Sequence, residues 1–129
     1  MNLLQVKNVS RAFGGLRAVQ DVSLNVSQGS LTALIGPNGA GKTTLFALMS
    51  GFLQPDHGQI ILDGVDITGR APHLNALLGL TRTFQIVQPF AAQTVRENIA
   101  VGAHLQHARR DEALSAAEAV ARRVGLYAQ

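Results

Sequence analysis

The chain has 129 residues, of which 47% are hydrophobic and 15% are charged, a balance typical of one globular domain and not of a disordered segment. It contains no cysteine, which excludes disulfides and thiolate metal sites and suits a reducing compartment. A net charge of +3 with no Trp and one Tyr leaves little to bind or stack on nucleic acid, and we expect no nucleic-acid partner.

The first predicted elements are strands. Residues 3–9 suit an edge strand. Apolar and polar residues alternate along 18–27, which predicts a half-buried antiparallel strand. After a turn at 27–30, the mostly apolar run 31–35 predicts a buried central strand of a parallel sheet.

The most informative motif follows directly. The segment 36–44 reads Gly-Pro-Asn-Gly-Ala-Gly-Lys-Thr-Thr, which contains the phosphate-binding P-loop pattern G-x-x-x-x-G-K-T. Its glycines let the backbone curl with the N–H groups pointing inward. Lys42 can reach the β- and γ-phosphates of a nucleotide, and the Thr43 hydroxyl can ligate Mg²⁺. The predicted phosphate contacts are Gly36, Asn38, Gly39, Ala40, Gly41, Lys42, Thr43 and Thr44.

The flanks of this loop agree with a P-loop and argue against a chance glycine-rich turn. Residues 42–50 read as a helix with Leu45, Leu48 and Met49 on one face, and Gly51 is a natural stop. Such a helix directs its positive N-terminal end at the bound phosphate.

The remaining elements are shorter or helical. Asp63-Gly64 between 59–62 and 65–67 predicts a two-residue hairpin. Helical character is expected at 74–78 and a short strand at 80–84. The capping box from Thr94 to Glu97 opens a helix through about Val101, and the Ala-rich segment 107–124 predicts a second helix. The expected apolar stripe of that second helix is Leu114, Ala117, Val120 or Ala121, and Val124.

Four features together resemble the N-terminal part of an ATP-binding cassette (ABC) ATPase domain. The first feature is the amino-acid sequence of the P-loop. Phe13-Gly14 lies 29 residues before Lys42, where the family places the aromatic that stacks on adenine. Gln85 lies 43 residues after Lys42 and resembles the family's Q-loop glutamine. Residues 51–58 with Asp63-Gly64 resemble the segment that usually reads G-x-x-x-P-x-x-G followed by a later G.

The resemblance implies an α/β fold. We expect a P-loop NTPase core of the ABC ATPase type with an antiparallel β subdomain and the start of a helical subdomain. Residues 1–85 would form the ATP-binding core with the β subdomain and Q-loop, and residues 86–129 a partial helical subdomain. ATP and Mg²⁺ are the implied cofactors.

The resemblance also assigns roles. Lys42 and Gln85 would be catalytic, Thr43 and Gln85 would ligate Mg²⁺, and Phe13 would stack on adenine. Gln85 would also relay the nucleotide state to a membrane subunit. The alternatives are a core aromatic for Phe13 and an ordinary surface residue for Gln85. For the apolar residues Ile86, Val87 and Phe90, the alternative to docking a membrane subunit is packing within the helical subdomain.

A narrower likeness concerns the transported substrate. Residues 11–19, 82–90 and 94–98 resemble the ATPase subunits of branched-chain amino acid importers, and urea or other amide importers share much of this wording. The implied partners are a second ATPase subunit and membrane permease subunits, contacted near Gln85–Phe90. No apolar run approaches the ~20 residues that span a bilayer, and the N-terminus does not resemble a secretory signal. We therefore expect a cytoplasmic protein held at the inner face of the plasma membrane by its permease.

Several family motifs do not occur in these residues. The signature loop (L-S-G-G-Q), the Walker B aspartate with its catalytic glutamate, and the switch histidine all lie further along the family's chain. We therefore expect a truncated cassette, active as an ATPase only at full length, whose 129 residues have negligible ATPase activity alone because nothing in them polarises the attacking water.

Two other functions remain open. One is a different P-loop enzyme, such as a nucleoside kinase or a GTPase, although the GTPase base-reading motif N-K-x-D does not occur. The other is a non-transport ABC protein of repair or translation, or a regulatory nucleotide-binding module.

Overall fold

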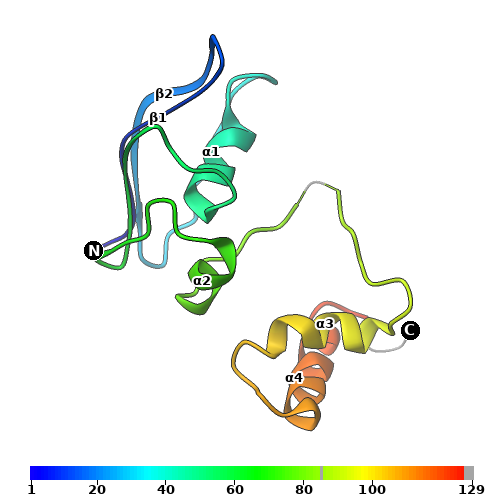
Figure 1. The fold of residues 1–129 in the computed structure, drawn as a ribbon. Coiled ribbons are helices and arrows are strands. Elements are labelled where there is room, and N and C mark those ends of the chain that lie inside the picture. The colour runs from blue at the N-terminus through cyan, green and yellow to red at the C-terminus, as the bar shows by residue number, and fades with distance from the viewer. Residues whose placement is uncertain (85, 127–129) are drawn as a thin grey trace. The chain divides into compact units, whose positions relative to one another are not determined.

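The computed structural model describes residues 1–84 and 86–126. The chain forms two compact units, Met1–Arg82 and Thr83–Gln129 (Figure 1). The predicted roles of 1–85 as ATP-binding core and of 86–129 as helical subdomain stay predictions.

The first unit contains one antiparallel sheet with strand order β2-β1-β3-β4. Its strands are β1 (Asn2–Phe13), β2 (Leu16–Ser27), β3 (His57–Leu62) and β4 (Val65–Asp66). The alternation predicted for this strand is confirmed over residues 22–27, where Val22, Leu24 and Val26 are half-buried and the polar residues between them are exposed. The prediction of an edge strand at 3–9 is wrong, because β3 pairs with the side of β1 that β2 leaves open.

Tight turns join the strands of this sheet. Gly14-Gly15 connects β1 to β2, and Gly14 has a φ of 60°. Asp63 and Gly64 have φ values of 47° and 79°, which confirms the predicted two-residue hairpin between β3 and β4. Gly14-Gly15 is likewise a dipeptide typical of a two-residue hairpin turn. Because β1 and β2 continue up to this turn, both strands are longer than the segments expected from hydrophobic alternation alone.

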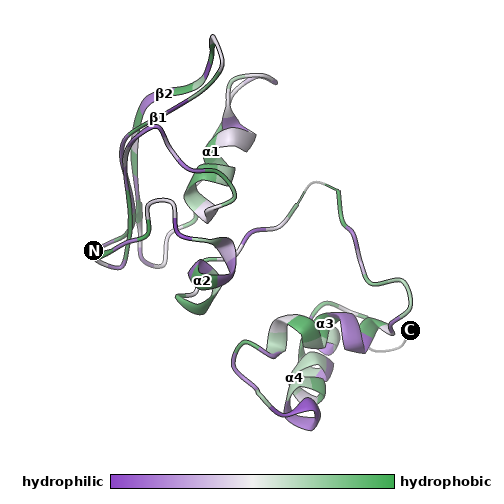
Figure 2. Cartoon of the chain, in the orientation of Figure 1, coloured by the Kyte–Doolittle hydropathy of each residue, from purple (hydrophilic) through white to green (hydrophobic). Residues whose placement is uncertain are grey.

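Helix α1 (Lys42–Ser50) packs against the sheet, and much of its ribbon has the green colour of hydrophobic residues in Figure 2. The predicted face of Leu45, Leu48 and Met49 is buried against Val6, Val9, Val19, Ile60, Leu62 and Ile67. Gly51 ends the helix with a left-handed φ of 92°, as predicted. A short helix, α2 (Pro72–Leu77), matches the helical character expected there.

Two predicted strands do not form. Residues 31–35 and 80–84 adopt no regular secondary structure, and the Leu31 and Ile35 side chains are 102% and 91% exposed. A buried parallel strand requires hydrogen-bonded neighbours on both sides. None of the four strands in the described residues pairs with either segment.

The second unit contains α3 (Val95–Ala103) and α4 (Arg110–Arg123), which pack through small residues. The capping box is confirmed: the Glu97 N–H donates to Thr94 Oγ1 at 3.1 Å, and the Thr94 N–H donates to Glu97 Oε2 at 3.1 Å. Ala100, Ala113 and Ala117 form the core of this unit. The predicted stripe of α4 is correct for Ala117 and Ala121, whereas Val120 and Val124 are exposed. Within residues 1–84 and 86–126, no helix has the length and apolar character needed to cross a membrane.

Candidate nucleotide-binding site

The P-loop leaves the N-terminus of α1 open. Gly39 and Gly41 have φ values of 86° and 95°, which turn the chain sharply into Lys42, the first residue of α1. No side chain caps this helix, and its first turn holds no acidic residue. The first N–H groups of α1 therefore lack a capping partner from the protein's own side chains, an arrangement that binds anions.

Gly41 brings this loop directly against β2. A Cβ atom at Gly41 would lie 2.3 Å from the carbonyl oxygen of Ala18, whereas a Cβ at Gly39 would meet nothing within 4 Å. Only glycine permits the first approach. The close contact places the end of the P-loop beside the β1–β2 hairpin.

The hairpin and the loop enclose an open cavity of about 350 Å³, here called the P-loop cavity. Its size lies within the range of small-molecule sites. It brings Phe13 together with all of the predicted phosphate contacts except Gly36 and Ala40, although Phe13 is far from them in the sequence. The lining residues are Phe13, Leu16, Arg17, Ala18, Pro37, Asn38, Gly39, Gly41, Lys42, Thr43 and Thr44. Gly36 and Ala40 belong to the same loop, where a Cβ at Gly36 would touch the Ala40 Cβ at 3.4 Å.

Lys42 is folded back on the loop that precedes it. Its Nζ donates to the carbonyl oxygen of Gly36 and, at 3.2 Å, to that of Pro37. These carbonyls hold the ammonium group over the loop. Its donors are therefore placed where they can exchange carbonyl oxygens for the oxygens of a phosphate chain.

Phe13 is the last residue of β1, and 43% of its surface is exposed. Arg11 lies over one face of its ring, with Cζ 4.9 Å from the ring centroid. The position of Phe13 is therefore that of a residue at the rim of a cavity and not of the core aromatic considered as its alternative. A base has room to stack only on the ring face that Arg11 leaves open.

The chemistry of the lining fits a magnesium nucleotide. Mg²⁺ usually takes one or two protein ligands and completes its octahedron with phosphate oxygens and water. Thr43 is exposed at the cavity and supplies one hydroxyl oxygen. A single hydroxyl ligand of this kind suits a metal that arrives with its phosphates. No cluster of three His, Cys, Asp or Glu side chains occurs in the described part of the chain.

The second predicted Mg²⁺ ligand, Gln85, lies outside the described residues. Its neighbours Ile86, Val87 and Phe90 are 78%, 76% and 55% exposed. Asn98 anchors the segment that follows: its Oδ1 accepts from the Phe90 N–H at 2.8 Å, and its Nδ2 donates to the Phe90 carbonyl at 3.1 Å. Both interpretations of these apolar side chains stay open.

Sequence reasoning missed three residues near the P-loop cavity. Arg17 lines it. Arg11 covers Phe13, and Asp56 lies 3.9 Å from Arg11. The available signal was the spacing of Arg11 and Phe13, which places both side chains on one face of a strand. Asp56 could not be found in this way, since it joins β1 only through the fold.

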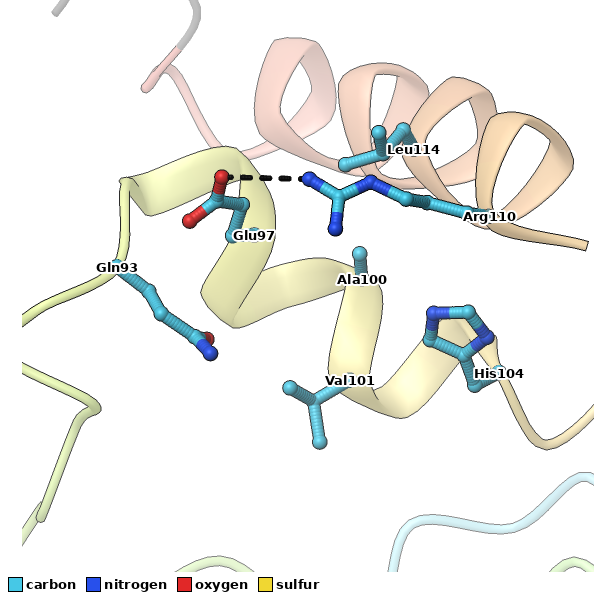
Figure 3. A pocket seen from close by; sticks show the side chains of 7 residues that line it. All are labelled: Gln93, Glu97, Ala100, Val101, His104, Arg110 and Leu114. Atoms are coloured by element: carbon cyan, nitrogen blue, oxygen red, sulfur yellow. Dashed lines mark ion pairs between the residues drawn. The ribbon is translucent and has the colours of Figure 1, made fainter.

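The second unit encloses a smaller cavity of about 180 Å³ between α3 and α4 (Figure 3). Glu97, which lines this cavity, has a structural role, because it completes the capping box and forms an ion pair with Arg110 at 3.6 Å. The His104 ring nitrogen Nδ1 lies 3.1 Å from the His107 carbonyl oxygen. Both side chains therefore have partners within this unit.

Comparison with known proteins identifies the family. Residues 19–128 match the ABC transporter family. A probable branched-chain amino acid transport ATP-binding protein of Archaeoglobus fulgidus is 46% identical over 101 residues, which are 78% of this chain and 39% of that protein. The spermidine/putrescine import ATP-binding protein of Chromobacterium violaceum is 49% identical over 100 residues, 78% of this chain and 27% of that protein.

A solved structure shares the fold. The ADP conformation of an ATP-binding cassette of an ABC transporter superposes with a TM-score of 0.81 at 31% identity, covering 98% of this chain and 55% of that chain. This chain thus spans well under two thirds of the length of the relatives that it matches. The P-loop, the hairpin aromatic and the match over residues 19–128 agree, and the chain belongs to the ABC transporter family of ATP-binding domains.

Proposed function

We propose that this chain binds ATP in the P-loop cavity, with adenine stacked on Phe13 and the phosphates at the start of α1. One observation carries the proposal: Phe13 and the P-loop line the same cavity. An aromatic ring at one end and an uncapped helix N-terminus at the other match the two chemically different ends of a nucleotide.

The proposed roles follow from position. The backbone of Gly36, Gly39, Ala40 and Gly41 cradles the phosphate chain, and Lys42 neutralises it. Thr43 and Gln85 are the residues proposed to hold Mg²⁺, which would supply positive charge against the phosphates. Lys42 and Gln85 are the proposed catalytic residues for ATP hydrolysis. Asn38 and Thr44 are the remaining proposed phosphate contacts.

At the level of the cell, we propose an ATP-binding subunit of an importer for branched-chain amino acids. The similarity to the Archaeoglobus fulgidus transport protein supports this substrate, while the similarity to a spermidine/putrescine import protein supports a polyamine as the second candidate. The proposed partners are a second ATPase subunit and a permease that docks near Gln85–Phe90. These partners would hold the chain at the inner face of the plasma membrane.

Phe13→Ala is the variant that tests the nucleotide site. Stacking on an aromatic side chain is worth ~1–3 kcal/mol per base, and ~1.4 kcal/mol is tenfold in affinity. We expect the affinity for ATP to fall about tenfold, while that for inorganic tripolyphosphate is unchanged, both by isothermal titration calorimetry. Phe46→Ala is a matched control, because Phe46 is 45% exposed in the same unit and does not line the cavity. Equal losses for both ligands would contradict base stacking.

The substrate is tested separately by uptake. Disrupting the gene that encodes this chain should lower the uptake of labelled leucine and leave that of labelled spermidine unchanged. Restoring the intact gene should recover leucine uptake, and restoring a copy with Lys42→Met should not. The reverse pattern, with spermidine uptake lowered, would favour the polyamine instead.

A further inference from the structure

Arg11 lies over one face of the Phe13 ring, and Phe13 lines the P-loop cavity, which Arg11 does not line. The two residues lie two positions apart on β1, and the Arg11 Cζ is 4.9 Å from the ring centroid. An arginine over an aromatic face attracts the ring's π electrons toward itself. Arg11 thus holds the ring from one face. It also draws electron density away from the opposite face, which an adenine would approach.

Neighbouring groups hold Arg11 in this position. Its Nη1 donates to the Gln54 carbonyl oxygen at 2.7 Å and lies 3.9 Å from Asp56 Oδ1. Asp56 is itself tied to β1, because its Oδ2 accepts from the Ala12 N–H at 2.8 Å and its own N–H donates to the Ser10 carbonyl at 2.8 Å. The guanidinium of Arg11 is therefore fixed by the loop that contains Gln54 and Asp56.

The head group is not arranged to satisfy all of its own donors. Arg11 Nε is buried and has no hydrogen-bond partner within the described residues. A side chain placed only to join β1 to the Gln54–Asp56 loop could turn this donor toward an acceptor. The observed orientation instead keeps the guanidinium carbon over the ring, 4.9 Å from its centroid.

We propose that Arg11 is a positioning residue for nucleotide binding. It fixes the ring of Phe13, an exposed side chain at a strand end, as a stacking platform for the adenine base. This inference rests on the proposed function, since it requires that Phe13 stack on a base. Arg11 itself does not touch the nucleotide; it acts through the ring.

Arg11→Met tests this, since methionine keeps apolar bulk but loses the cation. By calorimetry, we expect about fivefold weaker ATP binding and unchanged tripolyphosphate binding, because the loss of a cation–π contact acts only through the base. Arg11→Lys, which keeps a cation over the ring, should recover most of the ATP affinity. Lys7→Met is the charge control, because it removes one positive charge from an exposed position of the same strand. It should leave both affinities unchanged.

The double variant Arg11→Met/Phe13→Ala distinguishes the ways in which the proposal can fail. If Arg11 acts through the ring, this variant binds ATP no more weakly than Phe13→Ala alone.

Equal loss of ATP and tripolyphosphate binding in Arg11→Met would overturn the proposal and make Arg11 a structural residue. If Phe13→Ala weakens ATP binding but Arg11→Met does not, the positioning role fails while the nucleotide site stands. If Phe13→Ala has no effect, base stacking itself fails. Should Arg11→Met not fold, Arg11→Lys with Arg11→Gln provides the same comparison.

Discussion

Lys42→Met is expected to lower the affinity for ATP about 100-fold, the largest effect on binding of any single side chain in the P-loop cavity. The ammonium group is the charged donor that the structure places over the loop, 3.2 Å from the Pro37 carbonyl oxygen. Charge-assisted hydrogen bonds are worth about 1.5–3 kcal/mol each, so the loss of two of them to phosphate oxygens exceeds ~2.7 kcal/mol, or 100-fold. Calorimetric titration with ATP measures this loss directly.

The controls separate phosphate binding from loop structure. Because Lys42 also donates to the Gly36 and Pro37 carbonyls, the circular dichroism and thermal midpoint of the variant must be compared with those of the parent chain. Unlike the variants at Phe13 and Arg11, this one should weaken ATP and tripolyphosphate binding alike. Affinities within twofold of the parent would contradict the assignment of Lys42 to the phosphates.

Gly51→Ala is expected to have the largest effect on stability, lowering the free energy of unfolding by about 3 kcal/mol. A left-handed φ costs an alanine ~1–2 kcal/mol, and the φ of Gly51 is 92°. The new Cβ would lie 2.1 Å from the Arg70 carbonyl oxygen and 2.8 Å from Asn75 Nδ2. Asn75 Nδ2 donates to both the Ser50 and Arg70 carbonyls, at 3.1 and 3.0 Å. Disrupting these bonds adds about 1 kcal/mol each, which urea unfolding can measure.

Gly79→Ala is the matched control for this substitution. Gly79 has a similar φ of 98°, but a Cβ there would meet nothing within 4 Å. Its loss of stability should therefore be confined to backbone strain, ~1–2 kcal/mol. If the free energy of unfolding falls equally in both variants, the contact between the end of α1 and the start of α2 is not the reason that position 51 requires glycine.

Local chemistry made much of the fold predictable. The bounds of α1 follow from a glycine at each end and an apolar face between them, and the capping box defines the start of α3. The β3–β4 hairpin follows from Asp63-Gly64. In each case the residues that determine the structure lie within a few positions of one another.

The failures concern partners that are distant in the sequence. An apolar run such as 31–35 indicates that the segment is suited to a buried strand. It does not indicate which strands would pair with that segment. The central place of β1 depends on β3, which follows α1 in the chain. In the same way, the P-loop follows from its motif and the role of Phe13 from the resemblance to the family, whereas the fixation of Arg11 by Gln54 and Asp56 required the folded structure.

The contact between Gly41 and Ala18 has a consequence for the energetics of binding. With no room for even a Cβ between them, the loop and the hairpin meet at a rigid junction. The distance between the two ends of the P-loop cavity is then fixed when the chain folds. A nucleotide that spans the cavity does not have to draw two mobile segments together, so more of its contact energy remains as affinity. The site is therefore preorganised by the contact between Gly41 and Ala18, two residues that themselves line the P-loop cavity.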